Sequence, residues 1–149
     1  MIFLDTNLFQ RFFVAPVTDQ DRIWQAQAIG LMNAVKDGTI HATCSEVVIH
    51  EVCQILVSKR QCGMPTLDIV DFAQSVLSFA SMRFDGEQGT LFLRALGIWA
   101  DHPRLEFSDL VIAARSERSG HELATCDRHF RDLPFLEFWP PEIPVPDST

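Results

Sequence analysis

The stretch Ile2-Phe3-Leu4-Asp5-Thr6-Asn7 decides the fold class of this chain. Three apolar residues followed at once by polar ones are typical of a short buried strand that ends in a turn. The pattern returns near the other end of the chain, where residues 122–126 predict a strand and Asp127 follows it. Two predicted strands therefore end in an aspartate.

Helical patterns separate the predicted strands. Apolar spacing and helix-end signals predict helices over residues 8–14, 18–36, 45–60, 66–80, 87–100 and 109–119, and strands over 2–4, 39–43, 81–85, 122–126 and 136–139. Such alternation favours a parallel sheet covered by helices on both faces. We therefore expect an α/β fold with three layers, α/β/α, around a mostly parallel sheet of about five short strands.

The ends and faces of these helices give more specific expectations. Thr18-Asp19-Gln20-Asp21 resembles a capping box, Ser45 and Thr66 are expected to cap the helices that follow them, and Gly120 is expected to close the last helix. In the helix over 18–36, one face is expected to carry Ile23, Ala26, Gly30, Leu31, Ala34 and Val35.

Composition limits the kind of protein that this can be. The 149 residues are 47% hydrophobic and carry a formal net charge of −8, which fits one domain with a real core. That charge argues against holding nucleic acid or an acidic membrane by bulk positive charge, but it does not exclude an acidic pocket for cations. We expect a single domain over 1–139 and a Pro-rich tail over 140–149.

The apolar runs are too short for a signal peptide or a transmembrane helix. The four cysteines form no C-x-x-C pair, which favours reduced thiols and a cytoplasmic location.

Four acids stand at positions where chemistry is expected. Asp5 and Asp127 follow strands, and ligands of parallel sheets gather at the carboxyl ends of strands. Glu51 is expected on the apolar face of its helix, since Val47, Val48 and Ile55 lie three or four residues away, whereas Glu46 and His50 are expected nearer solvent. Asp109 opens the helix over 109–119.

Each of these acids also has a structural interpretation. Asp5, Asp109 and Asp127 would serve equally as turn or helix-cap residues, and Glu51 as one half of an ion pair with an arginine. A cluster of all four would instead need a compensating cation, for which Mg²⁺ or Mn²⁺ is the natural choice. Such ions align a water and stabilise the charge of phosphodiester cleavage.

Arg115, Arg118 and Arg128 lie near Asp109 and Asp127 in the sequence. They predict either a local rim that contacts RNA phosphates or a solvated face neutralised by Glu117 and Asp132.

Four short motifs resemble the PIN-domain family, and most closely the VapC-type toxins of prokaryotic toxin–antitoxin pairs. The motifs are Leu4-Asp5-Thr6-Asn7, Ser45-Glu46-Val47-Val48-Ile49-His50-Glu51-Val52, Phe107-Ser108-Asp109-Leu110-Val111-Ile112-Ala113-Ala114 and Leu123-Ala124-Thr125-Cys126-Asp127-Arg128-His129-Phe130. The resemblance implies a metal-dependent ribonuclease with catalytic, metal-binding acids at Asp5, Glu51, Asp109 and Asp127. It implies that Asn7 and Thr125 support these acids through hydrogen bonds.

The same resemblance implies partners. They are a structured RNA substrate such as tRNA or ribosomal RNA, a small antitoxin with a basic segment that covers the site, and a second copy of the chain in a homodimer.

Two other interpretations stay open at this point. One is a non-catalytic PIN-like module that binds RNA or protein through the same surface. The other is a phosphoryl-transfer or receiver domain that uses Asp5 as its nucleophile, although Asp5-Thr6-Asn7 lacks the second aspartate of the common D-x-D pattern.

Overall fold

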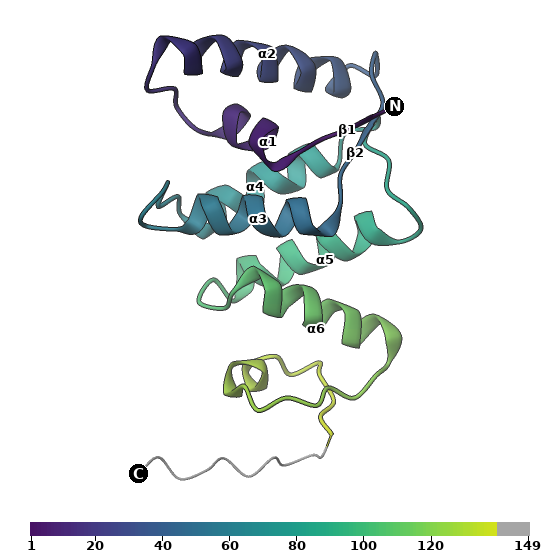
Figure 1. Ribbon diagram of the computed structural model, residues 1–149. Helices are drawn as coiled ribbons and strands as arrows, with labels where there is room; N and C mark the ends of the chain where they lie inside the picture. The colour runs from purple at the N-terminus through teal and green to yellow at the C-terminus, as the bar shows by residue number, and fades with distance from the viewer. Residues whose placement is uncertain (140–149) are drawn as a thin grey trace.

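The chain folds as a stack of helices with a very small sheet at one end (Figure 1). A computed structural model describes residues 1–139. In chain order its elements are β1 (Ile2–Phe3), α1 (Thr6–Phe13), α2 (Asp19–Lys36), β2 (Ala42–Thr43), α3 (Glu46–Val57), α4 (Thr66–Leu77), α5 (Gln88–Asp101), α6 (Phe107–Ser119) and the 3-10 helix η1 (Arg128–Asp132). The predicted tail over 140–149 lies outside the described residues.

The six predicted helices are all present. Thr18 accepts a hydrogen bond from the backbone of Asp21 and the Asp21 side chain accepts one in return, so the capping box is complete. Gly120 adopts the left-handed conformation, with φ of 61°, and ends α6 as expected. The expectation for Thr66 was wrong, because Pro65 occupies the cap position and Thr66 begins the helix.

The buried face of α2 also differs from the expectation. Ala28, Met32 and Val35 are its buried residues, whereas Ile23 and Trp24 are 54% and 43% exposed. The row Ala28-Met32-Val35 follows the helical spacing of four and three residues and packs on α1, which is the main neighbour of α2. The position of α1 therefore determines which side of α2 is buried.

The sheet contains two strands within residues 1–139, not the expected five or so. β1 and β2 are parallel, with Ile2 opposite Ala42 and Phe3 opposite Thr43. Of the other predicted strands, residue Met82 forms a single bridge to Ala42, and Leu123 forms one to Phe138. Short apolar runs do not specify their partner, and the segment over 122–126 pairs locally with the chain that follows it.

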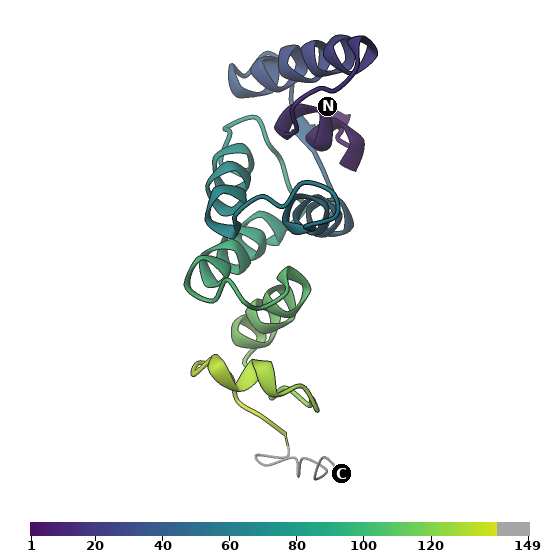
Figure 2. The same ribbon diagram turned by 90° about the vertical axis from the view of Figure 1, so that its left-hand side faces the viewer.

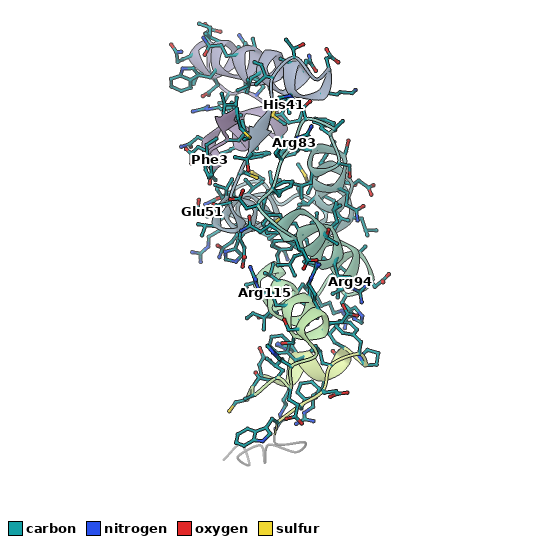
Figure 3. All side chains as sticks on the ribbon, turned by 90° about the vertical axis from the view of Figure 1, so that its right-hand side faces the viewer. Phe3, His41, Glu51, Arg83, Arg94 and Arg115 are labelled. Atoms are coloured by element: carbon teal, nitrogen blue, oxygen red, sulfur yellow. The ribbon has the colours of Figure 1, made fainter. Side chains whose placement is uncertain are left out.

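One consequence is that, within residues 1–139, no strand pairs with β1 on the side away from β2. Phe3 is 63% exposed there, and Figure 3 shows it on the same side of the molecule as Glu51. Of the predicted α/β/α layers, the structure shows only a small parallel sheet within a helix-rich stack. Figure 2 shows the same order of elements after a quarter turn.

The core lies where α3, α4, α5 and α6 meet. Phe92 and Trp99 on α5 are 0% and 1% exposed, and the Trp99 indole donates a hydrogen bond to the carbonyl of Leu105 at 3.0 Å. This bond ties α5 to the loop before α6 and so fixes where α6 begins. No helix within the described part of the chain is long and apolar enough to cross a membrane.

Candidate active site

Asp5 stands at the end of β1, with its carboxylate left free by the helix that it precedes. Asp5 occupies the cap position of α1, but its side chain accepts no hydrogen bond from the backbone of that helix. It accepts one from the side-chain amide of Asn7, at 3.3 Å. The helix-cap interpretation of Asp5 therefore does not account for its carboxylate, which remains exposed at the carboxyl end of the strand.

Thr6 connects this strand end to α3. Its hydroxyl donates a hydrogen bond of 2.6 Å to the Glu51 carboxylate, and the Thr6 residue is only 8% exposed. Asp5 and Glu51, which are 46 positions apart in the sequence, are thereby held on adjoining elements. A bond from a hydroxyl to a carboxylate restricts the orientation of the carboxylate.

The spacing of apolar residues predicted Glu51 on the buried face of α3. In the structure Glu51 lies on the exposed side instead. The buried residues of that helix are Val48, Ile49, Val52, Cys53 and Leu56. Val47 is 63% exposed, and Glu51 is exposed beside it (Figure 3). Apolar residues occupy both sides of this short helix, so spacing alone pointed to the wrong side. Glu46 and His50 are more buried than Glu51, which reverses the expected order.

Asp109 and Asp127 form a second pair, on α6 and on the segment before η1. Asp109 lies in the first turn of α6, where Glu106 and not Asp109 or Ser108 occupies the cap position. Burial raises the pKa of the Asp109 carboxyl, and the negative charges of Asp127 and Glu106 raise it further. The two aspartates are thus close enough to repel each other.

Asp127 differs from Asp5 because it serves as a helix cap. Its carboxylate accepts a hydrogen bond of 2.9 Å from the backbone N–H of His129 and lies 3.1 Å from the His129 ring. Thr125 accepts a bond of 3.0 Å from the backbone N–H of Asp127, so it fixes the turn and not the carboxylate itself. The Asp127 side chain is consequently held in one orientation.

The arginines near these aspartates are mostly engaged in ion pairs. Arg115 pairs with Glu46 on α3, and Arg118 pairs with Glu87. Glu117 instead binds Arg94 through two bonds of 2.7 Å, so the expected neutralising partners Glu117 and Asp132 were wrong. Among residues 1–139, Arg128 has no ion-pair partner and is exposed.

Two of the four cysteines, Cys44 and Cys53, are buried and add no nucleophile to either acid pair. Burial raises the pKa of both Cys44 and Cys53 to about 12, which keeps these thiols protonated. All four cysteines are free, and Cys126 beside Asp127 is exposed.

The elements that carry the four acids follow one another along the stack of helices. Figure 1 shows α1 and the end of β1 on one side of α3, and α6 with the segment over 122–139 on the other. Within the described residues, no group of three or more His, Cys, Asp or Glu side chains is placed to hold a metal ion. The cluster of all four acids therefore stays a prediction.

Family comparison covers nearly the whole described chain. The PIN domain family matches residues 2–136, which include Asp5, Glu51, Asp109 and Asp127. The chain belongs to the PIN domain family. PIN domains are generally nuclease modules, usually dependent on divalent metal ions, and they act on RNA. No curated protein sequence matches this chain.

One residue of this PIN domain, Thr6, was not singled out from the sequence. Thr6 carries the bond to Glu51, and His129 contacts Asp127 through its ring as well as its backbone. Thr6 lies inside the motif that opens the chain, so its place beside Asp5 was a usable signal. Its contact with Glu51 depends on how α1 sits on α3, which the local sequence does not specify.

Proposed function

We propose that this PIN domain is an endoribonuclease dependent on Mg²⁺ or Mn²⁺, and that it is the toxin component of a toxin–antitoxin pair that inhibits translation. The observation that carries the proposal is the family match over residues 2–136, a range that includes the four acids to which the sequence resemblance gives catalytic roles. The free carboxylate of Asp5, which does not cap its helix, supports a role outside folding.

The carboxylates of the four acids are suitable ligands for Mg²⁺. Carboxylate oxygens are the ligands that Mg²⁺ prefers, and Mg²⁺ is commonly held by one or two carboxylates together with waters and substrate phosphates. A site of this kind therefore needs no complete protein cage. In this proposal Asp5, Asp109 and Asp127 hold the metal, and Glu51 completes the shell or takes the proton of the attacking water. A bound divalent cation would supply alignment of that water and stabilisation of the charge developing on the phosphate.

Charge supports the proposed partners. The net charge of −8 and the two acid pairs favour an antitoxin whose basic segment covers the site. The RNA would be tRNA or ribosomal RNA, with Arg115, Arg118 and Arg128 near its phosphates. Arg128 is the best placed, because Arg115 and Arg118 already have acidic partners. We further propose a homodimer, and free cysteines are consistent with a cytoplasmic protein.

The substitution Asp5→Asn tests the chemistry. We expect it to abolish cleavage of total tRNA and ribosomal RNA in Mg²⁺ while leaving the unfolding temperature unchanged, because the carboxylate caps nothing. Asp71→Asn is the matched control, since Asp71 is an exposed aspartate on α4 with no proposed role in the reaction. EDTA should remove the activity of the unmodified protein. Full activity of Asp5→Asn in Mg²⁺ would refute the mechanism.

One observation favours a second candidate, a PIN module that binds RNA without cutting it. Within residues 1–139, no group of three or more His, Cys, Asp or Glu side chains is placed to hold a metal ion. Titration calorimetry with Mn²⁺ separates the two candidates. A nuclease is expected to bind Mn²⁺ in a manner that Asp5→Asn or Asp127→Asn weakens, whereas a non-catalytic module would bind RNA equally well in EDTA and show no Mn²⁺ site.

A further inference from the structure

We propose that the groove between α1 and α2, here called the Trp24 groove, binds one unpaired nucleobase of the RNA strand that reaches Asp5. This inference rests on the proposed function, which it deepens by naming how the strand is held. The groove has a volume of about 520 Å³ and is lined by Asn7, Leu8, Arg11, Trp24, Gln27, Ala28 and Leu31.

An exposed aromatic surface forms one wall of the Trp24 groove. Trp24 is 43% exposed. The Arg11 guanidinium lies over the Trp24 ring, with 4.4 Å between its central carbon and the ring centroid. Indole rings and guanidinium planes are the surfaces on which single-stranded bases stack in RNA-binding proteins.

The charges of the groove favour a base over a phosphate. Arg11 forms an ion pair with Asp21, whose carboxylate is also held by the capping box at Thr18. The positive charge of Arg11 is therefore already compensated, and Asp5 adds a negative charge nearby. A phosphate would gain little attraction here, whereas an uncharged aromatic base gains stacking on the exposed surface of the Trp24–Arg11 pair.

Two amide side chains line the same groove and suit the edges of a base. Gln27 offers both a donor and an acceptor. Asn7 donates its amide N–H to Asp5 and so keeps its carbonyl oxygen available as an acceptor. Asn7 thus belongs to the groove and to the acid pair at once, so a base bound in the groove brings its own strand to Asp5.

The groove is also held open before any ligand arrives. Gln25 donates a hydrogen bond of 2.9 Å to the carbonyl of Val14, which ties α2 to the end of α1 one residue beyond Trp24. A preformed site loses less conformational entropy on binding than one that must first be ordered.

The test compares two oligonucleotides of equal charge, in EDTA so that no cleavage occurs. The probes are a fluorescein-labelled 12-nucleotide oligo(A) and an abasic strand of the same length. We expect the unmodified protein to bind oligo(A) about ten-fold more tightly than the abasic strand. Trp24→Ala should lose about that ten-fold for oligo(A) and change nothing for the abasic strand, while Trp24→Phe should retain most of the affinity.

Two further variants control for folding and for position. Arg11→Lys keeps the ion pair with Asp21 but removes the planar guanidinium, so it should weaken oligo(A) binding by a smaller factor. Trp139→Ala removes an indole that is 61% exposed outside the groove and should have no effect. Quenching of tryptophan fluorescence by oligo(A) should persist in Trp139→Ala and disappear in Trp24→Phe.

Several outcomes would overturn this proposal. They are equal loss of affinity for both strands in Trp24→Ala, unchanged oligo(A) affinity in Trp24→Ala and Arg11→Lys, and absence of oligo(A) binding by the unmodified protein. A change of oligomeric state in Trp24→Ala with unchanged RNA affinity would make the groove an interface between copies. Failure of the proposed nuclease is distinguishable, because base binding that depends on Trp24 would then persist in a protein that cuts no RNA.

Discussion

Thr6→Val tests whether the hydrogen bond between Thr6 and Glu51 holds the first acid pair together. Valine has the shape of threonine but lacks the hydroxyl that donates to Glu51 at 2.6 Å. A hydrogen bond to a charged group contributes about 1.5–3 kcal/mol to stability, and this one should contribute less than that range because Glu51 is exposed and water replaces the lost donor. We expect the free energy of unfolding to fall by about 1 kcal/mol.

A double-mutant cycle isolates this bond from other effects of the substitution. Urea unfolding of the unmodified protein, Thr6→Val, Glu51→Ala and the double variant should give a coupling energy of about 1 kcal/mol. Thr6→Ser keeps the hydroxyl and serves as the matched control. A coupling energy below about 0.3 kcal/mol would show that the bond does not contribute, whatever the single variants do.

The same variants report on function. If Glu51 acts at the metal as proposed, releasing it should raise the Mg²⁺ concentration needed for half-maximal cleavage by about ten-fold in Thr6→Val, and Thr6→Ser should restore it. Lost stability alone would not change that Mg²⁺ requirement. An unchanged Mg²⁺ requirement in Thr6→Val, alongside a clear coupling energy, would make Thr6 a structural residue only.

Two further predictions concern α5: the packing of its glycines, and the ion pair that its Arg94 forms with Glu117 on α6. Gly89→Ala should destabilise the protein by about 1–3 kcal/mol, because a Cβ at Gly89 would lie 2.8 Å from the ring of Phe84. Gly97→Ala on the same helix meets nothing within 4 Å and should stabilise the protein by about 0.5–1 kcal/mol. Equal effects of the two substitutions in thermal unfolding would contradict this account. Glu117→Gln tests the ion pair with Arg94, whose hydrogen bonds lower the pKa of Glu117 below its ordinary value of 4.5. A lowered pKa stabilises the folded state above the ordinary value, and this stabilisation is lost as the pH falls from that value through the lowered pKa. The variant should therefore be less stable by about 0.5 kcal/mol at pH 7, and the difference should shrink as the pH falls below 4.5, as urea unfolding across that range would show.

Helices could be predicted from this sequence because their signals are local. The capping box at Thr18 and the left-handed Gly120 each depend on a few adjacent residues, and both are present in the structure. The position of Asp5 after a strand was also predictable, since an apolar run followed by Asp-Thr-Asn is a local pattern.

Pairing and orientation could not be predicted, because they depend on neighbours that are distant in the sequence. A run such as Leu123-Ala124 is compatible with several strand partners, and in the structure it bridges Phe138. The apolar residues of α3 surround most of the helix, so the side on which Glu51 lies is set by packing against other helices. Whether four acids meet is therefore a property of the tertiary arrangement and not of motif spacing.

The contrast between Asp5 and Asp127 shows which acid gives the cleaner test of function. The two residues have the same sequence setting, yet Asp127 caps η1 while the Asp5 carboxylate accepts a single side-chain bond of 3.3 Å. Replacing Asp127 removes a cap as well as a charge, so lost activity there has a folding explanation. Replacing Asp5 removes a charge that the fold does not use. A carboxylate kept at a strand end without a folding role is most simply explained by a ligand that needs it, and loss of cleavage in Asp5→Asn at unchanged stability would identify that ligand as part of the reaction.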